Sequence, residues 1–210
     1  MEPDRSECPI FSICKNFLQE INDYFAENLD NITCSELYDH YSYMFQILKE
    51  FKGNSSGFTG LSEYLIFRYI YNLLGGSFEA VQLTKDLFEF RSTDGIYRIG
   101  QSIPVVIEKR KYYPDIVVYN QDQLILAVEI KLYLADGIKS LEVDLKKLKE
   151  IHKQYPTAKC LFISYNIIPE KGKLYKKLLE EVNSNEWLDF IILAENNELF
   201  KEKMHQHLDI

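Results

Sequence analysis

The chain is poor in several residue types that mark particular classes of protein. Its 210 residues include one tryptophan, three methionines, four cysteines and six prolines. Basic residues are also in deficit, with 24 Lys and Arg against 32 Asp and Glu. Internal repeats and low-complexity tracts are absent from the sequence. With 46% hydrophobic residues, this composition predicts an ordinary globular protein and excludes fibrous and disordered classes.

Two further absences concern the compartment. No apolar run approaches the roughly 18 residues that a membrane-spanning helix needs, and the acidic residues 1–7 do not resemble the basic start of a secretory signal. The cysteines form no C-x-x-C pair and predict ordinary thiols instead of a disulfide framework. We therefore expect an intracellular protein without a membrane partner, cytoplasmic or nucleoid-associated, with the nucleus or a virus-infected cell left open.

Positive charge is concentrated in the middle of the chain. Residues 1–60 carry 4 basic and 10 acidic side chains, and residues 181–210 carry 2 and 7. Residues 101–180 reverse this balance, with 14 basic against 10 acidic. The overall charge of −8 argues against a protein that simply coats nucleic acid, but the basic excess of the middle segment leaves room for a local anionic partner.

Hydrophobic periodicity predicts helices first, then strands, then an alternation of both. The spacing of apolar residues predicts three helices, at 10–29, from about Ser35 to Phe51, and at 61–74 before Gly75-Gly76. A meander of short strands follows at 78–83, 86–90, 95–99 and 103–109, and a hairpin comes after it. The rest of the chain alternates: a helix at 138–151, a strand at 159–165, a helix at 173–182 and a strand at 187–193. A short polar helix near 198–207 ends the predicted order. This order predicts an α/β fold with a mixed sheet flanked by helices. We divide the chain into a helical N-terminal extension, residues 1–58, and a main domain, residues 59–210, with a linker at 53–60.

The hairpin at 114–120 and 124–132 carries charges inside apolar strands. Alternation places one set of side chains on a wholly apolar face: Ile116, Val118, Leu126, Val128 and Ile130. The opposite face collects all the charges: Asp115, Val117, Tyr119, Ile125, Ala127, Glu129 and Lys131. If Gln121–Gln123 form a three-residue loop, Asp115 lies directly across from Glu129.

Two facing carboxylates in a sheet are unfavourable unless something compensates them. At a cross-strand separation of roughly 5 Å they repel each other and both lose solvation. A cation between Asp115 and Glu129 would remove this cost, and oxygen ligands favour Mg²⁺ or Mn²⁺. Lys131 lies on the same face and can contact a metal-bound water or a phosphate.

Pro114-Asp115, followed after a hairpin by Glu129-Ile130-Lys131, resembles the signature of the PD-(D/E)xK nuclease superfamily. That family has the restriction-endonuclease-like fold, whose core order αβββαβ is similar to the order expected here between residues 61 and 165, about half of the chain. The resemblance implies metal-dependent hydrolysis of DNA. It implies that Asp115, Glu129 and the Ile130 carbonyl hold the metal and that Lys131 positions the attacking water.

The same resemblance assigns roles outside the hairpin. Many members carry a carboxylate on the first core helix, which implies that Glu63 is a third ligand or a base; the alternative is an acidic residue that merely interacts with a helix N-terminus. Five basic residues would neutralise phosphates of bound DNA, or else form solvated faces: Lys109, Arg110, Lys111, Lys139 and Lys146.

Several alternatives stay open from the sequence. The charges of the hairpin could form a surface salt-bridge cluster, or the fold could bind nucleic acid or protein without cutting. An RNA endonuclease is a third alternative, with His40 as an added ligand, as in the viral cap-snatching members of the superfamily. The acidic N-terminal helices could form a homodimer or bind a partner subunit. We expect Glu89 to be solvated, and His205 and His207 to lie in a frayed tail.

Overall fold

A computed structural model describes residues 9–52, 59–85, 87–134, 138–167 and 173–208. Most of the predicted linker at 53–60 lies outside these residues. Among the described residues, none of the helices is long and apolar enough to cross a membrane.

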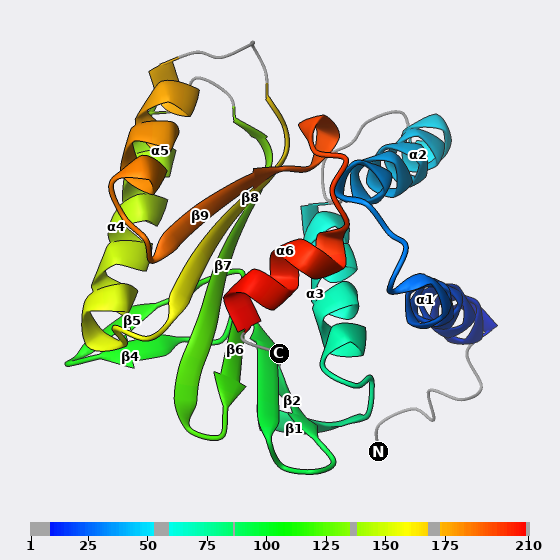
Figure 1. The fold of residues 1–210 in the computed structure, drawn as a ribbon. Helices are drawn as coiled ribbons and strands as arrows, with labels where there is room; N and C mark the ends of the chain where they lie inside the picture. The colour runs from blue at the N-terminus through cyan, green and yellow to red at the C-terminus, as the bar shows by residue number, and fades with distance from the viewer. Residues whose placement is uncertain (1–8, 53–58, 86, 135–137, 168–172, 209–210) are drawn as a thin grey trace.

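A seven-stranded mixed sheet forms the centre of the molecule (Figure 1). Its strands lie in the order β1 (Phe78–Thr84), β2 (Leu87–Ser92), β3 (Tyr97–Gln101), β6 (Ile116–Asn120), β7 (Gln123–Leu134), β8 (Lys159–Ile167) and β9 (Leu188–Ile192). The pairs from β1 to β7 are antiparallel, whereas β7, β8 and β9 are parallel. The predicted mixed α/β class is confirmed.

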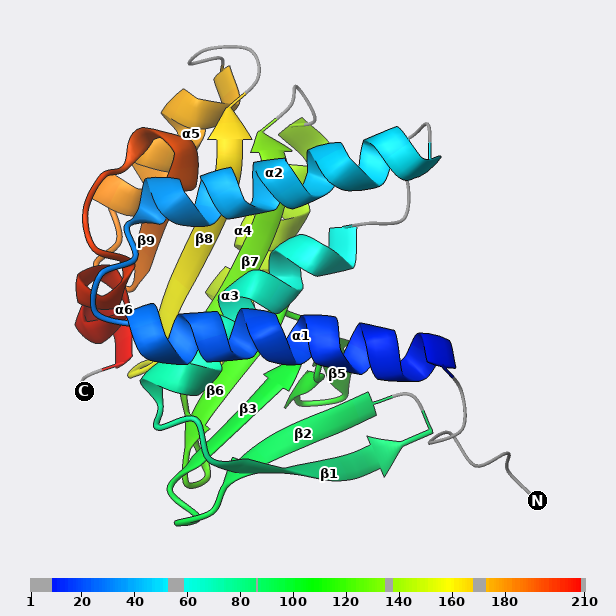
Figure 2. The same cartoon turned by 90° about the vertical axis from the view of Figure 1, so that its right-hand side faces the viewer.

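Helices cover both faces of this sheet. They are α1 (Pro9–Asn28), α2 (Cys34–Lys52), α3 (Thr59–Leu73), α4 (Ile138–Gln154), α5 (Lys173–Asn183) and α6 (Phe200–Leu208), with a short 3₁₀ helix, η2, at Leu193–Glu195. One hydrophobic cluster joins α1, α2, α3 and α6 to one face, and a second cluster joins α4 and α5 to the other (Figures 1 and 2). The central strands β6, β7 and β8 are therefore shielded from water on both faces, and this burial sets the cost of any charge placed there.

The N-terminal helices belong to the first of these cores. Phe25 of α1 and Leu37 of α2 are buried in the same cluster as Ile70 of α3. Thr33 caps α2, because its Oγ1 accepts the Glu36 N–H at 3.2 Å while the Glu36 carboxylate accepts the Thr33 N–H at 2.7 Å. This reciprocal pair is a capping box, and the predicted cap at Ser35 is wrong by two residues.

The end of α3 follows the sequence prediction. Gly75 and Gly76 have φ values of 101° and 66°, a region that side chains with a Cβ rarely adopt. The Gly76 N–H donates to the Tyr71 carbonyl at 3.0 Å, and the Gly75 N–H donates to the Asn72 carbonyl at 3.0 Å. These two bonds form a Schellman motif, which satisfies carbonyls that the helix end would otherwise leave free.

The turn between β6 and β7 differs from the predicted one. Asn120 pairs with Gln123, so the turn has two central residues, Gln121 and Asp122, instead of three. A β-bulge at Ile125 then shifts the register by one residue, and Val118 pairs with Leu126 as the three-residue loop would have required. The prediction for Ile125 is wrong, since the bulge packs it against the core on the opposite face.

Two other segments also differ from the predictions. The strand expected at 103–109 does not join the meander, because β4 (Val105–Ile107) pairs with β5 (Arg110–Tyr112) as a separate hairpin that packs on α4. The C-terminal helix is no frayed tail: His207 is 7% exposed, and its Nε2 lies 3.2 Å from Oδ2 of Asp189. Glu89 is also buried instead of solvated, paired with two arginines.

Candidate active site at the start of β6

Four elements bring charged side chains together at one end of the β6–β7 pair. Asp115 immediately precedes β6, Glu129 and Lys131 lie in β7, and Glu63 lies in the first turns of α3. Helix α4 adds two residues that we did not predict as site residues, Asp144 and Lys147. We describe these six side chains together as the carboxylate cluster.

The last residue pair of β6 and β7 at this end is Ile116 with Val128. The same register, extended by one residue beyond β6, sets Asp115 opposite Glu129. Beyond the end of β6 the Asp115 side chain replaces a backbone acceptor, because its Oδ2 accepts the Ile130 N–H at 2.6 Å. Burial raises the pKa of Asp115, and this hydrogen bond opposes the rise.

Glu129 is the most buried charged residue of the cluster, with an exposed fraction of 0%. Its Oε1 lies 2.6 Å from the Lys147 ammonium. Its Oε2 is buried and accepts no hydrogen bond from any described residue. Burial first, and the nearby Asp115 charge second, raise the pKa of Glu129 to about 8. A buried carboxylate oxygen without a donor leaves a place for a ligand that carries positive charge.

The two lysines of the cluster share the Asp144 carboxylate. Lys131 Nζ lies 2.9 Å from Asp144 Oδ2, and Lys147 Nζ lies 3.5 Å from Asp144 Oδ1. The Lys147 ammonium also donates to the Tyr113 carbonyl at 2.9 Å. Burial alone would lower the pKa of Lys131, but the hydrogen bond to Asp144 and the surrounding carboxylates raise it overall. Lys131 is therefore held charged beside the carboxylates.

Glu63 reaches the cluster from the opposite layer. Its Oε2 accepts a hydrogen bond from Gln101 Nε2 of β3 at 2.6 Å. Burial raises the pKa of Glu63; the Asp115 carboxylate raises it further, and the Lys131 ammonium lowers it. Glu63 is therefore within electrostatic reach of both residues, and its role in the site stays a prediction.

Asp144 and Lys147 were not predicted as site residues, although the periodicity of the helix contains a signal for Asp144. The buried stripe of α4 runs through Leu141, Leu145, Leu148 and Ile151, and Asp144 lies three residues after Leu141 on that stripe. An acidic residue at a position that periodicity assigns to the core requires a partner there. Lys147 lies off that stripe, where a lysine is usually solvated, but its side chain is only 17% exposed.

The donor set meets part of the requirement for a hard divalent cation. In the described residues, no group of three or more His, Cys, Asp or Glu side chains is arranged to hold a metal ion. Asp115 and Glu129 are, however, close enough for the Asp115 charge to raise the pKa of Glu129, and Asp115 also accepts the Ile130 N–H. One or two carboxylates, with water and substrate phosphate completing the shell, is the usual protein contribution to a Mg²⁺ site. Asp115 and Glu129 are thus the two oxygen donors of the kind that Mg²⁺ or Mn²⁺ prefers, and the metal site itself stays a prediction.

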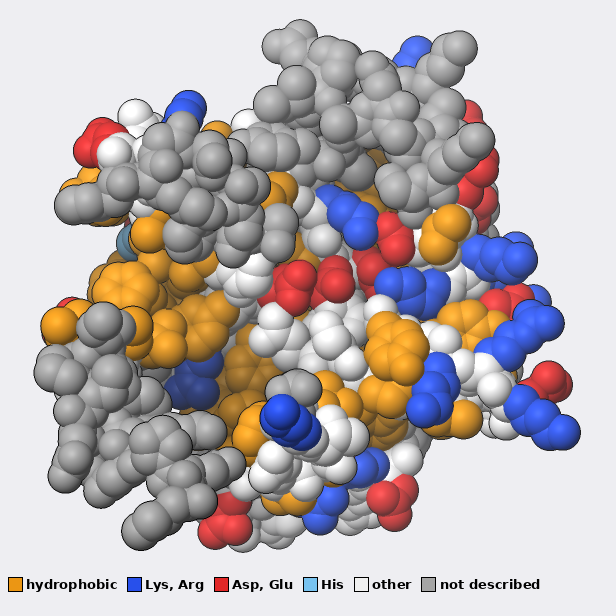
Figure 3. Space-filling model, turned by 180° about the vertical axis from the view of Figure 1, so that it is seen from behind, with side chains coloured by type: hydrophobic (Ala, Val, Ile, Leu, Met, Phe, Trp, Pro, Cys, Tyr) orange, Lys and Arg blue, Asp and Glu red, His pale blue; other side chains and the backbone are white. Residues whose placement is uncertain are grey.

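The predicted phosphate-binding residues lie on the β4–β5 hairpin and on α4. Lys109, Arg110 and Lys111 are exposed on the β4–β5 hairpin, and Lys146 is exposed on α4. The side chain of Lys139 lies outside the described residues. Figure 3 shows acidic side chains gathered near the middle of one face, with Lys and Arg side chains beside them toward α4 and the β4–β5 hairpin.

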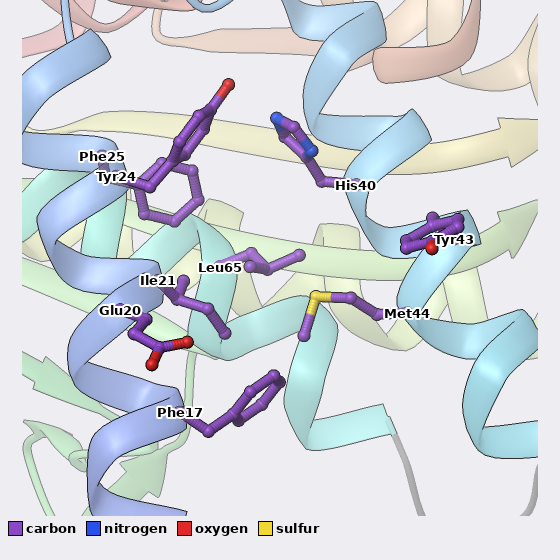
Figure 4. A pocket seen from close by; sticks show the side chains of 9 residues that line it. All are labelled: Phe17, Glu20, Ile21, Tyr24, Phe25, His40, Tyr43, Met44 and Leu65. Carbon is purple, nitrogen blue, oxygen red and sulfur yellow. The ribbon is translucent and has the colours of Figure 1, made fainter. Parts of the chain in front are cut away.

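His40 lies in a separate, mostly apolar groove between α1 and α2 (Figure 4). The groove has a volume of about 270 Å³, and its lining includes Phe17 and Met44. The His40 ring contacts the Tyr24 ring edge-on, with 5.1 Å between centroids. The same groove is also lined by Glu20, and it is separate from the carboxylate cluster of β6 and β7. The dimer or partner interface predicted for these helices stays a prediction.

Comparison with known proteins adds no assignment. No protein-family profile, curated protein or solved structure matches this chain.

Proposed function

We propose that this protein is a metal-dependent nuclease that hydrolyses phosphodiester bonds in DNA, of the PD-(D/E)xK type. One observation carries the proposal: Glu129 is fully buried, one of its oxygens has no donor among the described residues, and it lies opposite Asp115 in the strand register. Lys131 lies on the same strand, two residues further on. This is the arrangement that a two-carboxylate metal site with an adjacent lysine requires.

The cost of the cluster supports a functional origin. Breaking a buried ion pair costs roughly 3–5 kcal/mol, yet replacing the whole pair by apolar residues is often neutral or stabilising. A sheet face that is otherwise lined by Val117, Ala127 and Phe162 could have been completed with apolar residues at no loss of stability. Raised carboxylate pKa values at one covered site are typical of residues retained for chemistry.

The order of elements also supports the restriction-endonuclease-like fold as part of the proposal. The succession α3, β3, β6, β7, α4, β8 contains a helix, a three-stranded meander, a helix and a further strand. The β1–β2 hairpin precedes this succession, and the β4–β5 hairpin is inserted between β3 and β6. The meander is antiparallel and β8 joins β7 in parallel, as a crossover through α4 allows.

The proposed roles follow from the positions of the side chains. Asp115, Glu129 and the Ile130 carbonyl would hold Mg²⁺, and Glu63 would either complete the set or accept a proton from water. A bound Mg²⁺ supplies Lewis-acid stabilisation of the charge that develops on the phosphate. Lys131, oriented by Asp144 at 2.9 Å, donates a hydrogen bond to the attacking water and stabilises the anionic phosphate oxygens.

A second function, a nuclease-like module that binds without cutting, is favoured by the Lys147 contact. With its ammonium 2.6 Å from Glu129 Oε1, the cluster already contains a positive charge where the metal would bind. A site whose carboxylates stay permanently paired with lysines would be a structural network and would hold no metal.

Plasmid cleavage separates these two functions. We expect wild-type protein to nick or linearise supercoiled DNA in Mg²⁺ or Mn²⁺, and we expect Asp115→Asn, Glu129→Gln and Lys131→Ala each to lose at least 100-fold in rate. The matched control is Asp122→Asn on the same hairpin, whose side chain is fully exposed and whose variant should cleave normally. Thermal melting confirms that each variant is folded.

A binding module gives a different pattern. Wild-type protein would then cleave no DNA, and calorimetry would detect no Mg²⁺ or Mn²⁺ site that Asp115→Asn removes. Cleavage of single-stranded RNA but not of DNA, lost in His40→Ala, would instead assign the RNA endonuclease function.

A further inference from the structure

The β4–β5 hairpin and the outer side of α4 form one basic surface next to the carboxylate cluster. Five residues define this basic surface: Lys109, Arg110, Lys111, Lys146 and Lys149. All five are exposed, and the described part of the chain offers none of them a salt-bridge partner. Their neighbours differ in this respect, since Lys153 pairs with Glu150 at 2.6 Å and Lys177 pairs with Glu142 at 2.5 Å.

Packing holds the hairpin against the helix. Val105 and Ile107 of β4 belong to the same hydrophobic cluster as Leu141 and Leu148 of α4. The pKa of Glu150 on α4 is lowered, first by its hydrogen bond to Lys153 and further by the charges of Lys146 and Arg110. Arg110 of the hairpin is therefore within electrostatic reach of Glu150, which lies on the same helix as Lys146.

The basic surface is directly connected to the carboxylate cluster on both of its elements. Lys111 and Asp115 are four residues apart, a span of at most about 14 Å or roughly four base-pair steps of duplex DNA. On α4, the exposed Lys146 immediately precedes Lys147 in the sequence. The Lys147 ammonium contacts the buried Glu129 carboxylate. Lys147 also binds the Tyr113 carbonyl at the base of the hairpin, which fixes the hairpin relative to Glu129.

We infer that this surface binds the phosphate backbone of duplex DNA next to the cleaved bond, with the β4–β5 hairpin acting as a clamp for several phosphates. The chain as a whole is acidic, with a net charge of −8, so a polyanion is repelled elsewhere and has reason to approach here. Unpaired lysine and arginine side chains release counterions from DNA, whereas lysines already paired with carboxylates contribute little. This inference rests on the proposed function, because it takes the carboxylate cluster as the point of cleavage.

The test is binding without cleavage, measured by fluorescence anisotropy of a labelled 20-base-pair duplex in EDTA at 50–200 mM NaCl. The test variant is Lys109→Gln/Arg110→Gln/Lys111→Gln. Its matched control removes three exposed lysines from α1, α2 and the β1–β2 turn, as Lys15→Gln/Lys49→Gln/Lys85→Gln. Each phosphate contact contributes a slope of about 0.9 to the plot of log affinity against log salt.

Because the hairpin variant loses three phosphate contacts, we expect the slope of its plot of log affinity against log salt to be smaller in magnitude by about 2.7 than that of wild type. Between 50 and 200 mM NaCl the affinity of the variant should then fall by a factor about 40-fold smaller than that of wild type. At 100 mM NaCl its affinity should be at least tenfold weaker than that of wild type, and the control variant should stay within twofold. Equal weakening of both variants, or of neither, would overturn the inference. If the hairpin variant cleaves plasmid in Mg²⁺ as fast as wild type, the inferred role of the basic surface is wrong and the proposed function stands. If wild type itself does not cleave, the result counts against the proposed function.

Discussion

Lys147 of α4 places its ammonium 2.6 Å from Oε1 of Glu129, a carboxylate with no exposed surface in the middle of the sheet. The contact joins a helix on one layer to a central strand, and it supplies the counter-charge that burial of Glu129 demands. A divalent cation at Glu129 would compete with this ammonium. The two states, lysine-paired and metal-bound, therefore exclude each other at that oxygen.

Replacing Lys147 by methionine should separate stability from metal affinity. Without metal, Lys147→Met leaves Glu129 buried and unpaired, and we expect the free energy of unfolding to fall by about 3–5 kcal/mol. Because the competing charge is gone, the Mn²⁺ or Mg²⁺ affinity should rise about tenfold. Calorimetry and thermal melting with and without metal measure both effects. Lys146→Met, at the exposed neighbouring position, is the control, and weaker metal binding by Lys147→Met would show that Lys147 only positions Glu129.

The raised pKa of Glu129 predicts a pH dependence of stability. Burial and the Asp115 charge raise this pKa to about 8, from an ordinary value of 4.5. The folded protein then binds the proton more tightly than the unfolded chain, so the stabilisation is complete below the ordinary value and is lost as pH rises toward 8. We expect the metal-free melting temperature to fall between pH 5 and pH 8, by an amount that corresponds to at most about 1.4 kcal/mol per pH unit for one group.

Glu129→Gln tests whether this residue is the source. The variant cannot titrate at position 129, so its melting temperature should change less with pH than that of wild type over the same window. Asp122→Asn, whose side chain is fully exposed, should keep the wild-type dependence. An unchanged pH dependence in Glu129→Gln would assign the effect to Asp115 and Glu63, whose pKa values are raised in the same direction.

Asp144 should act on the reaction through Lys131. Since its Oδ2 lies 2.9 Å from Lys131 Nζ, Asp144→Asn should weaken the orientation of that ammonium and lower the cleavage rate about tenfold to 100-fold, with a small effect on the apparent affinity for DNA. A pH profile of cleavage should shift as well, because the carboxylate helps to keep Lys131 charged. Glu142→Gln on the exposed side of α4 is the control. Equal rates in both variants would remove Asp144 from the site.

His207 should stabilise the fold rather than take part in a metal site. It is 7% exposed and lies 3.2 Å from Asp189 of β9, which ties α6 to the edge of the sheet. We expect His207→Ala to lower the free energy of unfolding by about 1–3 kcal/mol, measured by denaturant titration. Gln206→Ala, at an exposed position on the same helix, should change it by less than about 0.5 kcal/mol. A neutral His207→Ala would mean that the pair contributes nothing.

Periodicity by itself determined the helices, most of the strands of the main sheet, and which face of the β6–β7 hairpin is apolar. Ile116, Val118 and Val128 alternate with their neighbours, and that alternation survives in the structure because each face is buried in its own core. The same alternation predicted that Asp115 and Glu129 lie on one face, because cross-strand pairing is a local property of a short hairpin. The prediction that these two residues lie opposite each other assumed a three-residue loop, whereas the turn has two central residues. The bulge at Ile125 restores the register that the three-residue loop would have produced.

Only the tertiary structure decided what surrounds these two carboxylates. Lys147 and Asp144 reach the carboxylates from α4, and Gln101 reaches Glu63 from β3. Such contacts depend on how layers stack, which no local pattern encodes. The separation of β4–β5 from the main sheet is of the same kind, because short strands with exposed residues can pair in more than one way. Long-range packing, rather than local propensity, sets the burial that raises the pKa of Glu129.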